Sequence, residues 1–351
     1  MSSGLSEGAP GVRAEVGLGA RQRRYVVIGA GAVGGALAAQ LAGSGHRVIL
    51  VARGEHGRLI ADGGLVVRRP TSVDRVRLSV ALDPDELTLT TDDLLVLATK
   101  AQDAERALLD WHTRPVTGGG LVADLPILTF QNGLATESIA LRRYAQVYGA
   151  TIAIAASYLV LGEIVSPSLP PAVGGIWLGR YPTGIDELAE TVVGDLRSSG
   201  FAAWTVPDIR QMKAAKLLGN VANGLDLLAG ADEDRDRART LLRSEAVAVF
   251  DAAGLRLPPS GGLDFHGVRF DVEPVPGHTP GRLSTWQSFA RGASSEIDFL
   301  NGEIVLLGRQ HGVPTPVNAR LQRLLVDPSL PHTLTALLAV VPARTPERLL
   351  S

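Results

Sequence analysis

The chain has 351 residues, enough for two domains with separate cores, and 45% of them are hydrophobic, as is usual for globular proteins. Its 34 Lys and Arg residues are balanced by 36 Asp and Glu residues, so it lacks the basic excess that nucleic-acid-binding proteins carry. The chain has no cysteine, which excludes disulfide scaffolds, thiolate zinc sites and cysteine nucleophiles.

The N-terminal stretch, residues 1–23, is rich in Gly, Ser and Arg and predicts a flexible tail. It lacks the apolar core of a secretory signal, and no apolar run in the chain reaches the roughly 18 residues that a membrane helix needs. We therefore expect a cytoplasmic protein with no membrane or nucleic-acid partner and no metal site. The sequence leaves a homodimer open.

The first half of the chain alternates strands and helices. An apolar strand at 25–28, a helix at 32–43 and a strand at 47–53 form a βαβ unit. Further strands are predicted at 64–67, 76–82, 94–99, 126–130, 145–148, 151–161, 175–178 and 202–206. This alternation predicts a mostly parallel sheet with an antiparallel extension, in an α/β, Rossmann-like dinucleotide-binding domain over residues 24–206.

The second half loses its strand signal. Helices are predicted at 208–228, 234–253, 284–291, 295–310 and 316–325, with a long loop at 255–283. We expect an all-α C-terminal domain over residues 207–331, followed by a tail at 332–351 that is either a short helix or frayed.

A glycine turn joins the first strand to the first helix. The segment GAGAVGG contains the pattern G-x-G-x-x-G through Gly29, Gly31 and Gly34. Gly29 would allow the tight turn, Gly31 would let the backbone approach a pyrophosphate, and Gly34 would let the helix pack closely on the strand. Because a strand precedes the pattern and a helix follows it, the turn predicts a dinucleotide site that also includes Ala30, Ala32 and Val33.

The end of the second strand bears on the choice of cofactor. NAD enzymes usually place an acid there to bind the ribose hydroxyls, whereas this chain has Arg53 and no acid before Glu55. Arg53 can pair with a 2′-phosphate through two hydrogen bonds, so the sequence favours NADP(H) over NAD; a solvated surface arginine is the alternative.

Several further polar residues could either bind a ligand or have an ordinary structural role. Two of them follow strand ends, and the others lie on two predicted helices. Lys100 and Asn132 come just after strand ends, where α/β sheets bind ligands, but they would also suit a helix start and an Asn-Gly turn. Lys216, Asn220 and Asn223 are spaced to share one helical face, with Lys213 at its edge, although a solvated polar stripe would have this spacing too. The remaining candidate is Glu296, which either gains from a helix dipole or holds a catalytic lysine.

These segments, in this order, resemble the ketopantoate reductase (2-dehydropantoate 2-reductase) family over roughly residues 24–326. The motifs that carry the resemblance are GAGAVGG, VAR, TK, QNG, K-L-x-x-N and S-x-x-Q…SEIDFLNG. The resemblance implies a site between two domains and NADPH-dependent reduction of a 2-oxo acid, with Lys216 as catalytic lysine and Glu296 as its acidic partner. It also implies cofactor contacts by Lys100 and Asn132, and substrate contacts by Lys100, Asn132, Asn220, Asn223 and Ser284.

The substrate side departs from the family pattern. Gly224 stands where the family has a second asparagine, with Asn223 one residue early. Ser288 replaces an aspartate, and Ala293 replaces an arginine that opens the helix. These differences leave open an NADPH reductase acting on another oxo acid or an imine.

Two further alternatives differ from this reductase in function or in catalytic residue. One is a catalytically silent NADP-binding regulator, against which the retention of both Lys216 and Glu296 argues. The other is an opine or hydroxyacid dehydrogenase, which would require a catalytic histidine such as His266 or His278 in the long loop. In the favoured interpretation, the Lys216 ammonium stabilises the charge that develops on the carbonyl oxygen and then donates a proton.

Overall fold

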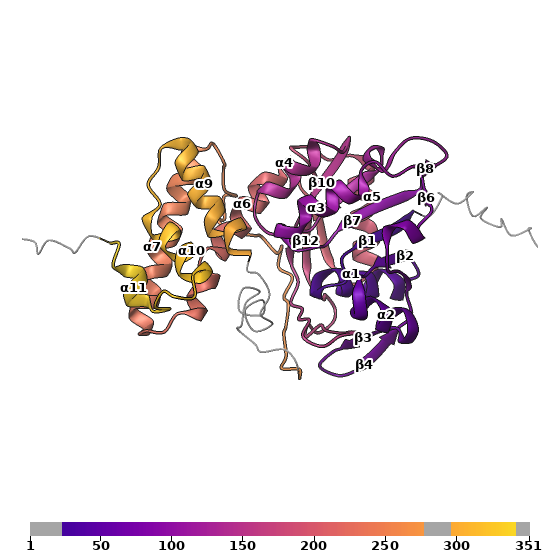
Figure 1. Ribbon diagram of the computed structural model, residues 1–351, viewed down its shortest axis with the longest axis horizontal. Helices are drawn as coiled ribbons and strands as arrows, with labels where there is room; N and C mark the ends of the chain where they lie inside the picture. Colours follow the sequence, from indigo (N-terminus) through magenta and orange to yellow (C-terminus); the bar gives the residue numbers. More distant parts are fainter. Residues whose placement is uncertain (1–22, 277–295, 342–351) are drawn as a thin grey trace, which may run out of the picture.

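The βαβ unit with the glycine turn lies at the centre of the larger domain. Strands β1 (Arg24–Ile28) and β2 (Arg47–Val51) are parallel neighbours, joined through helix α1 (Ala32–Gly43). The computed structural model describes residues 23–276 and 296–341. Figure 1 shows two domains, a sheet domain and a helical domain, with α6 between them.

The main sheet has eight strands in the order β13-β12-β10-β9-β7-β1-β2-β5. All neighbouring pairs are parallel except β10 and β12, so the expected antiparallel extension is confirmed. The carboxyl ends of β1, β7 and β9 therefore meet at one edge of the sheet. The strands not yet given are β5 (Ser79–Ala81), β7 (Asp93–Leu97), β9 (Pro126–Thr129), β10 (Gln146–Ala153), β12 (Gly175–Arg180) and β13 (Ala202–Thr205).

Helices cover both faces of this sheet because its strands are apolar on both sides. Along β1, Val27 packs into the core under α1 and α5, whereas Val26 packs into the opposite core under α3 and α4. The bounds of these helices are α3 (Ala101–Trp111), α4 (Ala135–Leu141) and α5 (Glu187–Ser198). Helix α2 (Gly54–Gly63) follows β2.

Two small sheets border the main one. Strands β3 (Leu65–Arg68), β4 (Val73–Val76) and β11 (Glu163–Val165) form a three-stranded sheet beside α1. Strands β6 (Leu89–Thr90) and β8 (Val116–Thr117) form a two-stranded one.

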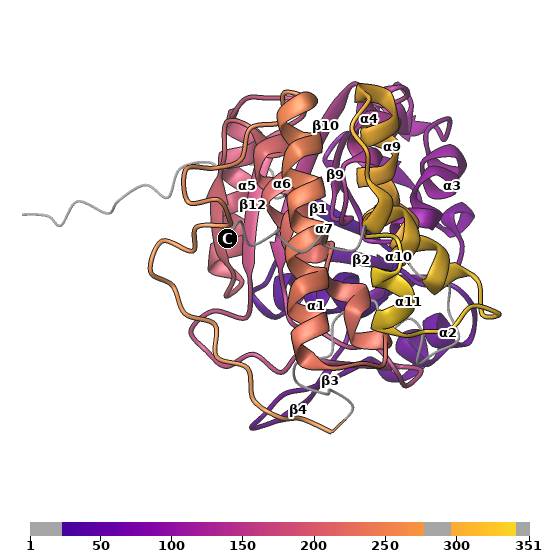
Figure 2. The ribbon, with the colours of Figure 1, turned by 90° about the vertical axis from the view of Figure 1, so that its left-hand side faces the viewer.

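The helical domain has its own apolar core, as expected for a separate all-α unit. Figures 1 and 2 show the long helix α7 beside α9, α10 and α11. The bounds are α6 (Ile209–Asn220), α7 (Asp232–Ala252), α9 (Asn301–His311), α10 (Pro316–Val326) and α11 (Leu334–Leu338). No described helix is both long enough and apolar enough to span a bilayer.

Several predicted boundaries differ from the structure. The helix expected over 208–228 ends at Asn220 and continues as a 3-10 turn at Asn223–Leu227. At Gly224 a β-carbon would lie 2.5 Å from Leu325, so a glycine there lets α10 approach this turn closely. The helix expected from residue 295 begins with a 3-10 turn at Glu296–Phe299.

The helical domain also extends beyond its predicted limit at residue 331. Leu334 and Leu337 of α11 are fully buried in the helical core, so this part of the predicted tail belongs to the domain. The helix predicted at 284–291 lies outside the described residues.

The described part of the long loop, 255–276, runs back onto the sheet domain. Val272 forms a bridge with Ser168, and the indole nitrogen of Trp177 donates to the carbonyl of Asp264 at 3.2 Å. The loop therefore links the end of α7 to the outer strands of the sheet.

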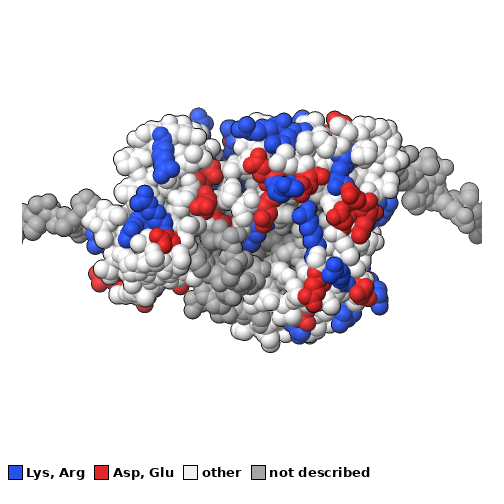
Figure 3. Space-filling view, in the orientation of Figure 1, with Lys and Arg blue, Asp and Glu red and all other residues white. Residues whose placement is uncertain are grey.

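Basic and acidic side chains are interspersed over the face drawn in Figure 3. This distribution fits the near-neutral net charge of −2. A charged substrate would therefore be attracted by local groups rather than by a field of the whole molecule.

Candidate active site

A cavity of about 420 Å³ brings most of the predicted site residues together. The carboxyl ends of β1, β7 and β9 supply one wall, as expected for a parallel sheet, and α6 with the turn at Glu296 supplies the other. The predicted residues that line it are Gly29, Gly31, Ala32, Val33, Lys100, Asn132, Lys216, Asn220, Asn223 and Glu296.

The glycine turn has the geometry that its pattern predicts. Gly29 has a φ of 110°, in the region that favours glycine, and a β-carbon at Gly34 would lie 1.9 Å from the Gly29 carbonyl oxygen. At Gly31 a β-carbon would meet open space, so the backbone there can be approached from the cavity. Helix α1 has neither a side-chain cap nor an acid in its first turn, which leaves its first N–H groups available to an anion.

Two predicted cofactor residues near the turn do not line the cavity. Gly34 lies beneath the turn, and the Ala30 carbonyl instead pairs with a ring nitrogen of buried His56 at 2.8 Å. The other ring nitrogen of His56 accepts from the Gly162 N–H at 2.8 Å, so this ring connects the glycine turn to the segment before β11.

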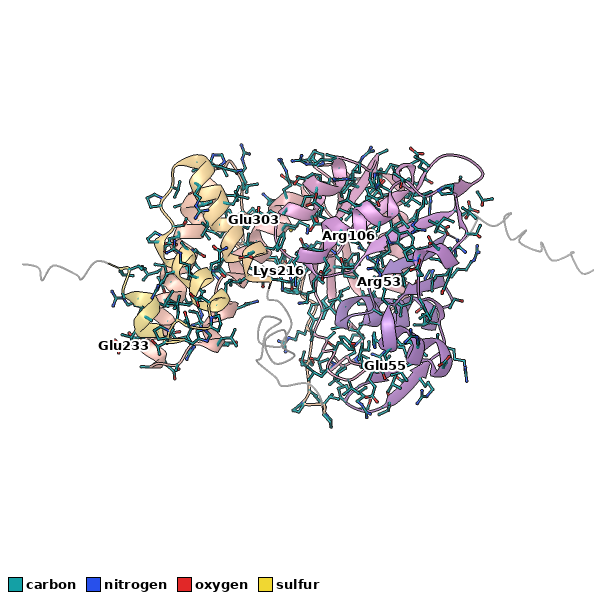
Figure 4. The ribbon with its side chains drawn as sticks, viewed as in Figure 1. Arg53, Glu55, Arg106, Lys216, Glu233 and Glu303 are labelled. Carbon is teal, nitrogen blue, oxygen red and sulfur yellow. The ribbon has the colours of Figure 1, made fainter. Side chains whose placement is uncertain are left out.

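Arg53 lies outside the cavity on the surface, at the start of α2. Its side chain is 63% exposed, and its guanidinium is 3.4 Å from the carboxylate of Asp110. Arg106 of α3 binds the other oxygen of Asp110 at 2.8 Å, so two guanidinium groups share one carboxylate. Figure 4 shows Arg53 and Arg106 on the sheet domain. The sequence did not single out Arg106, because nothing local to α3 indicates that its Asp110 meets Arg53.

Lys216 lies where the two domains meet (Figure 4) and faces the cavity. Burial lowers the pKa of its ammonium, because desolvation penalises the charged form. Among the described residues, no carboxylate forms an ion pair with it.

Three asparagines continue the polar wall from Lys216. The Asn220 amide donates to the Asn132 side chain at 3.3 Å, and the Asn223 amide donates to the Asn220 oxygen at 3.5 Å. Asn220 and Asn223 stay adjacent although α6 ends between them, so the predicted common face persists into the 3-10 turn.

The expected ion pair between Glu296 and Lys216 is not the one that the structure has. Glu296 instead binds Lys100, with 2.7 Å between Oε2 and Nζ, and its other oxygen accepts from the Ala101 N–H at 3.2 Å. The turn that begins at Glu296 packs against the N-terminus of α3, where the helix dipole and a free N–H favour a carboxylate. Because Lys100 immediately precedes α3, a carboxylate at this helix end pairs with Lys100 and not with Lys216.

Lys213, expected at the edge of the Lys216 face, is turned away from the cavity. Its Nζ lies 2.6 Å from Glu137 Oε1, and both side chains are almost fully buried. The sequence did not predict this pair, because Glu137 of α4 and Lys213 of α6 are far apart along the chain and only the fold brings them together.

The cavity also has an apolar wall that the motifs did not predict. Phe130, Ile152, Ile154 and Tyr158 line it. Phe130 directly follows β9, Ile152 belongs to β10, and the other two lie in the segment after β10. They carry no motif, so only the fold brings them to the site.

The other residues that the sequence singled out lie either outside the described ranges or away from this cavity. Ser284, His278, Ser288 and Ala293 fall outside the described residues. His266 is half-exposed near Asp264 and packs against Trp204, away from the cavity. No group of three potential metal ligands occurs within the described ranges.

Comparison with known proteins identifies the family. Residues 25–170 match "Ketopantoate reductase PanE/ApbA" and residues 208–327 match its C-terminal counterpart. The 2-dehydropantoate 2-reductase of Pyrococcus horikoshii is 27% identical, over 86% of this chain and 96% of that protein. The enzyme of the same name from Archaeoglobus fulgidus is also 27% identical, over 87% and 97%.

Solved structures agree with this assignment. A PanE/ApbA family ketopantoate reductase from Ralstonia eutropha has a TM-score of 0.69 and 26% identity, covering 87% of this chain and 97% of that one. A D-mandelate dehydrogenase with NADH and anilino(oxo)acetate shares the fold, with a TM-score of 0.70, 23% identity and coverage of 86% and 97%. The chain therefore belongs to the ketopantoate reductase PanE/ApbA family of NAD(P)-dependent oxidoreductases.

Proposed function

We propose that this protein uses NADPH to reduce a 2-oxo acid to a 2-hydroxy acid, with Lys216 polarising and protonating the carbonyl. The observation that carries the proposal is that Lys216 and the glycine turn line one cavity. 2-Dehydropantoate, named for the curated relatives, is the first substrate to test. Another oxo acid or an imine is the alternative, because the identity is low and Asn223, Gly224 and Ser288 depart from the family pattern.

The residues at the glycine turn fit a dinucleotide. The free N–H groups at the start of α1 and the open space at Gly31 would accept the pyrophosphate. Arg53 and Arg106, both exposed, would bind the 2′-phosphate that distinguishes NADPH from NADH. Bound there, the nicotinamide cofactor would supply the hydride.

Lys216 would act on the carbonyl oxygen. Negative charge develops on this oxygen as its carbon is reduced, and a positioned ammonium stabilises that charge more strongly in a desolvated cavity than in water. The lowered pKa of Lys216 supports a second role as proton donor, because a weaker base gives up its proton more readily near neutral pH.

Lys100 and the asparagines would bind the rest of the substrate. Lys100 is about one third exposed and is held by Glu296, so its ammonium can meet a substrate carboxylate or a cofactor phosphate at the rim. The amides of Asn132 and Asn220 can exchange their mutual hydrogen bond for bonds to a carboxylate or hydroxyl. A contact between Ser284 and the substrate remains a prediction.

A substrate panel tests the proposal. NADPH oxidation is followed with 2-dehydropantoate, other 2-oxo acids and imines, and binding of NADPH is measured by calorimetry. Substituting Lys216→Ala should lower kcat by about 1,000-fold while the Kd for NADPH stays within about twofold, because the lysine acts at the oxygen and not on the cofactor.

A second variant separates the two roles of this lysine. Lys216→Arg keeps the positive charge, but a guanidinium does not donate a proton near neutral pH, so it should recover only part of the lost kcat. Full activity in Lys216→Ala would overturn the assignment. If the protein binds NADPH but turns over no substrate, the alternative of a catalytically silent NADP-binding regulator would be favoured.

A further inference from the structure

We propose that Lys213 is a positioning residue for Lys216. Its buried ion pair with Glu137 fixes α6 against the sheet domain and so sets how far the Lys216 ammonium reaches into the cavity. The inference rests on the proposed function, because it concerns how the same site places its proton donor.

The use of lysine in this chain is the first support. Of the 34 Lys and Arg residues only three are lysines, namely Lys100, Lys213 and Lys216. All three lie where the two domains meet, two lining the cavity and one in the buried pair with Glu137. A lysine presents a compact ammonium on a flexible stem, whereas the planar guanidinium of arginine needs more room. Lys213 thus shares this rare residue type with the two cavity lysines.

The contacts of the Lys213 ammonium join α6 to the cavity wall. Its Nζ lies 2.6 Å from Glu137 Oε1 and donates to the carbonyl of Gln131 at 2.8 Å. Thr129 at the end of β9 donates to the same carboxylate oxygen at 2.6 Å. Gln131 precedes Asn132, which lines the cavity, so one ammonium holds the segment that carries Asn132.

The geometry of α6 passes this constraint on to Lys216. Residues three apart on a helix are separated by about 4.5 Å along the axis and about 60° around it, so displacing Lys213 displaces Lys216 with it. The start of the helix is close-packed on the sheet, where a β-carbon at Gly149 of β10 would lie 2.9 Å from Ile209. Lys213 lies on α6 between this close-packed start and Lys216, which lines the cavity.

A third ionisable group joins the cluster from the helical domain. Burial is the main cause that raises the pKa of Glu303 on α9; the Glu137 carboxylate raises this pKa further, and the Lys213 ammonium lowers it. Glu137 Oε2 is buried and has no hydrogen-bond partner within the described residues. Removing Lys213 alone would leave two buried carboxylates without their cation, which would destabilise the fold and obscure any effect on catalysis.

A double variant avoids this difficulty. Lys213→Met together with Glu137→Gln removes both charges, so the melting temperature should stay closer to that of the parent than in Lys213→Met alone. The hydrogen bond from Lys213 to the Gln131 carbonyl is still lost in this double variant. We expect kcat to fall by about 100-fold, as a small misplacement can cause, with the Kd for NADPH nearly unchanged.

A readout independent of turnover is the pH dependence of Lys216 acylation, measured by mass spectrometry with an amine-reactive acetylating reagent. With only three lysines, the peptides are easily assigned. In the double variant the midpoint for Lys216 should rise toward that of an ordinary lysine, because a loosened helix lets water reach the ammonium.

The matched control is the ion pair of Arg24 with Asp93, which is also partly or fully buried but lies at the opposite end of β1 from the glycine turn. Arg24→Met with Asp93→Asn should leave kcat and the Lys216 midpoint unchanged. The proposal is overturned if the Lys213/Glu137 double variant keeps both the kcat and the acylation midpoint of the parent. If the parent reduces no substrate, the proposed function fails, and the acylation midpoint alone decides whether Lys213 positions Lys216.

Discussion

At the scale of single residues, spacing predicted which side chains share a surface but not which partners they meet. The positions of Lys216 and Asn220 on one face of α6 followed from helical periodicity. The partner of Glu296 did not, because Lys100 is 196 positions away and only the docking of two domains brings them together. The prediction that Lys213 lies at the edge of the Lys216 face was wrong for the same reason, since nothing in the sequence of α6 indicates that Lys213 pairs with Glu137.

Arg53 gives a prediction about cofactor choice. If it binds the 2′-phosphate, Arg53→Ala removes a charge-assisted pair and should raise the Kd for NADPH by about 10-fold or more, with little change for NADH. Calorimetric titration with both cofactors checks this.

The control for Arg53 is an arginine at the other end of β2, the strand that precedes Arg53 in the chain. Arg47 is exposed at the amino end of β2, far from the glycine turn, so Arg47→Ala should leave both Kd values unchanged. Equal weakening of NADPH and NADH by Arg53→Ala would mean that this arginine does not read the phosphate.

At the scale of elements, the first βαβ unit was the most predictable part of the molecule. Its apolar strands, glycine pattern and helix are all encoded within one short segment, and β1, α1 and β2 lie within two residues of the predicted limits. The end of α6 was less predictable. The 3-10 turn that follows it packs Gly224 against Leu325 of α10, a contact between distant segments that no local pattern indicates.

The close approach at Gly34 can be tested directly. A methyl group there would meet the Gly29 carbonyl oxygen at 1.9 Å, so Gly34→Ala must displace α1 from the turn. We expect a loss of about 1–3 kcal/mol in the free energy of unfolding, measured by urea denaturation, and weaker NADPH binding.

Gly43→Ala is the matched control, because Gly43 ends the same helix and a β-carbon there meets open space. It should be neutral or slightly stabilising, since alanine is the better helix former. Were Gly34→Ala equally harmless, the turn would not require glycine at this position.

At the scale of the whole molecule, composition and the loss of strand signal predicted two domains, but not the charges buried between them. Glu137, Lys213 and Glu303 come from three helices and meet only in the folded chain. The burial of the Glu303 carboxylate could not be predicted from the sequence, because an acid in the first turn is an ordinary feature of a helix such as α9.

The buried carboxyl of Glu303 predicts how stability depends on pH. Desolvation, and secondarily the Glu137 charge, raise the pKa of Glu303 to about 7, above its usual value of 4.5. Between these values the folded state binds the extra proton and the unfolded state does not, so this contribution is fully present below about pH 4.5 and is lost as the pH rises through about 7. Glu303→Gln stays neutral throughout. It should therefore flatten the fall in unfolding free energy between pH 5 and 8, and stabilise the protein at pH 8 by up to about 3 kcal/mol.

Glu233 provides the comparison for this experiment, because it is exposed at the far end of the helical domain from the sheet (Figure 4). Glu233→Gln removes the same charge from the same domain, yet water solvates this carboxylate in both the folded and the unfolded state. Urea denaturation across the pH range should therefore give a profile like that of the parent for Glu233→Gln and a flatter one for Glu303→Gln. Parallel profiles for all three proteins would mean that Glu303 is already ionised at neutral pH, and that the interface tolerates a second negative charge beside Glu137.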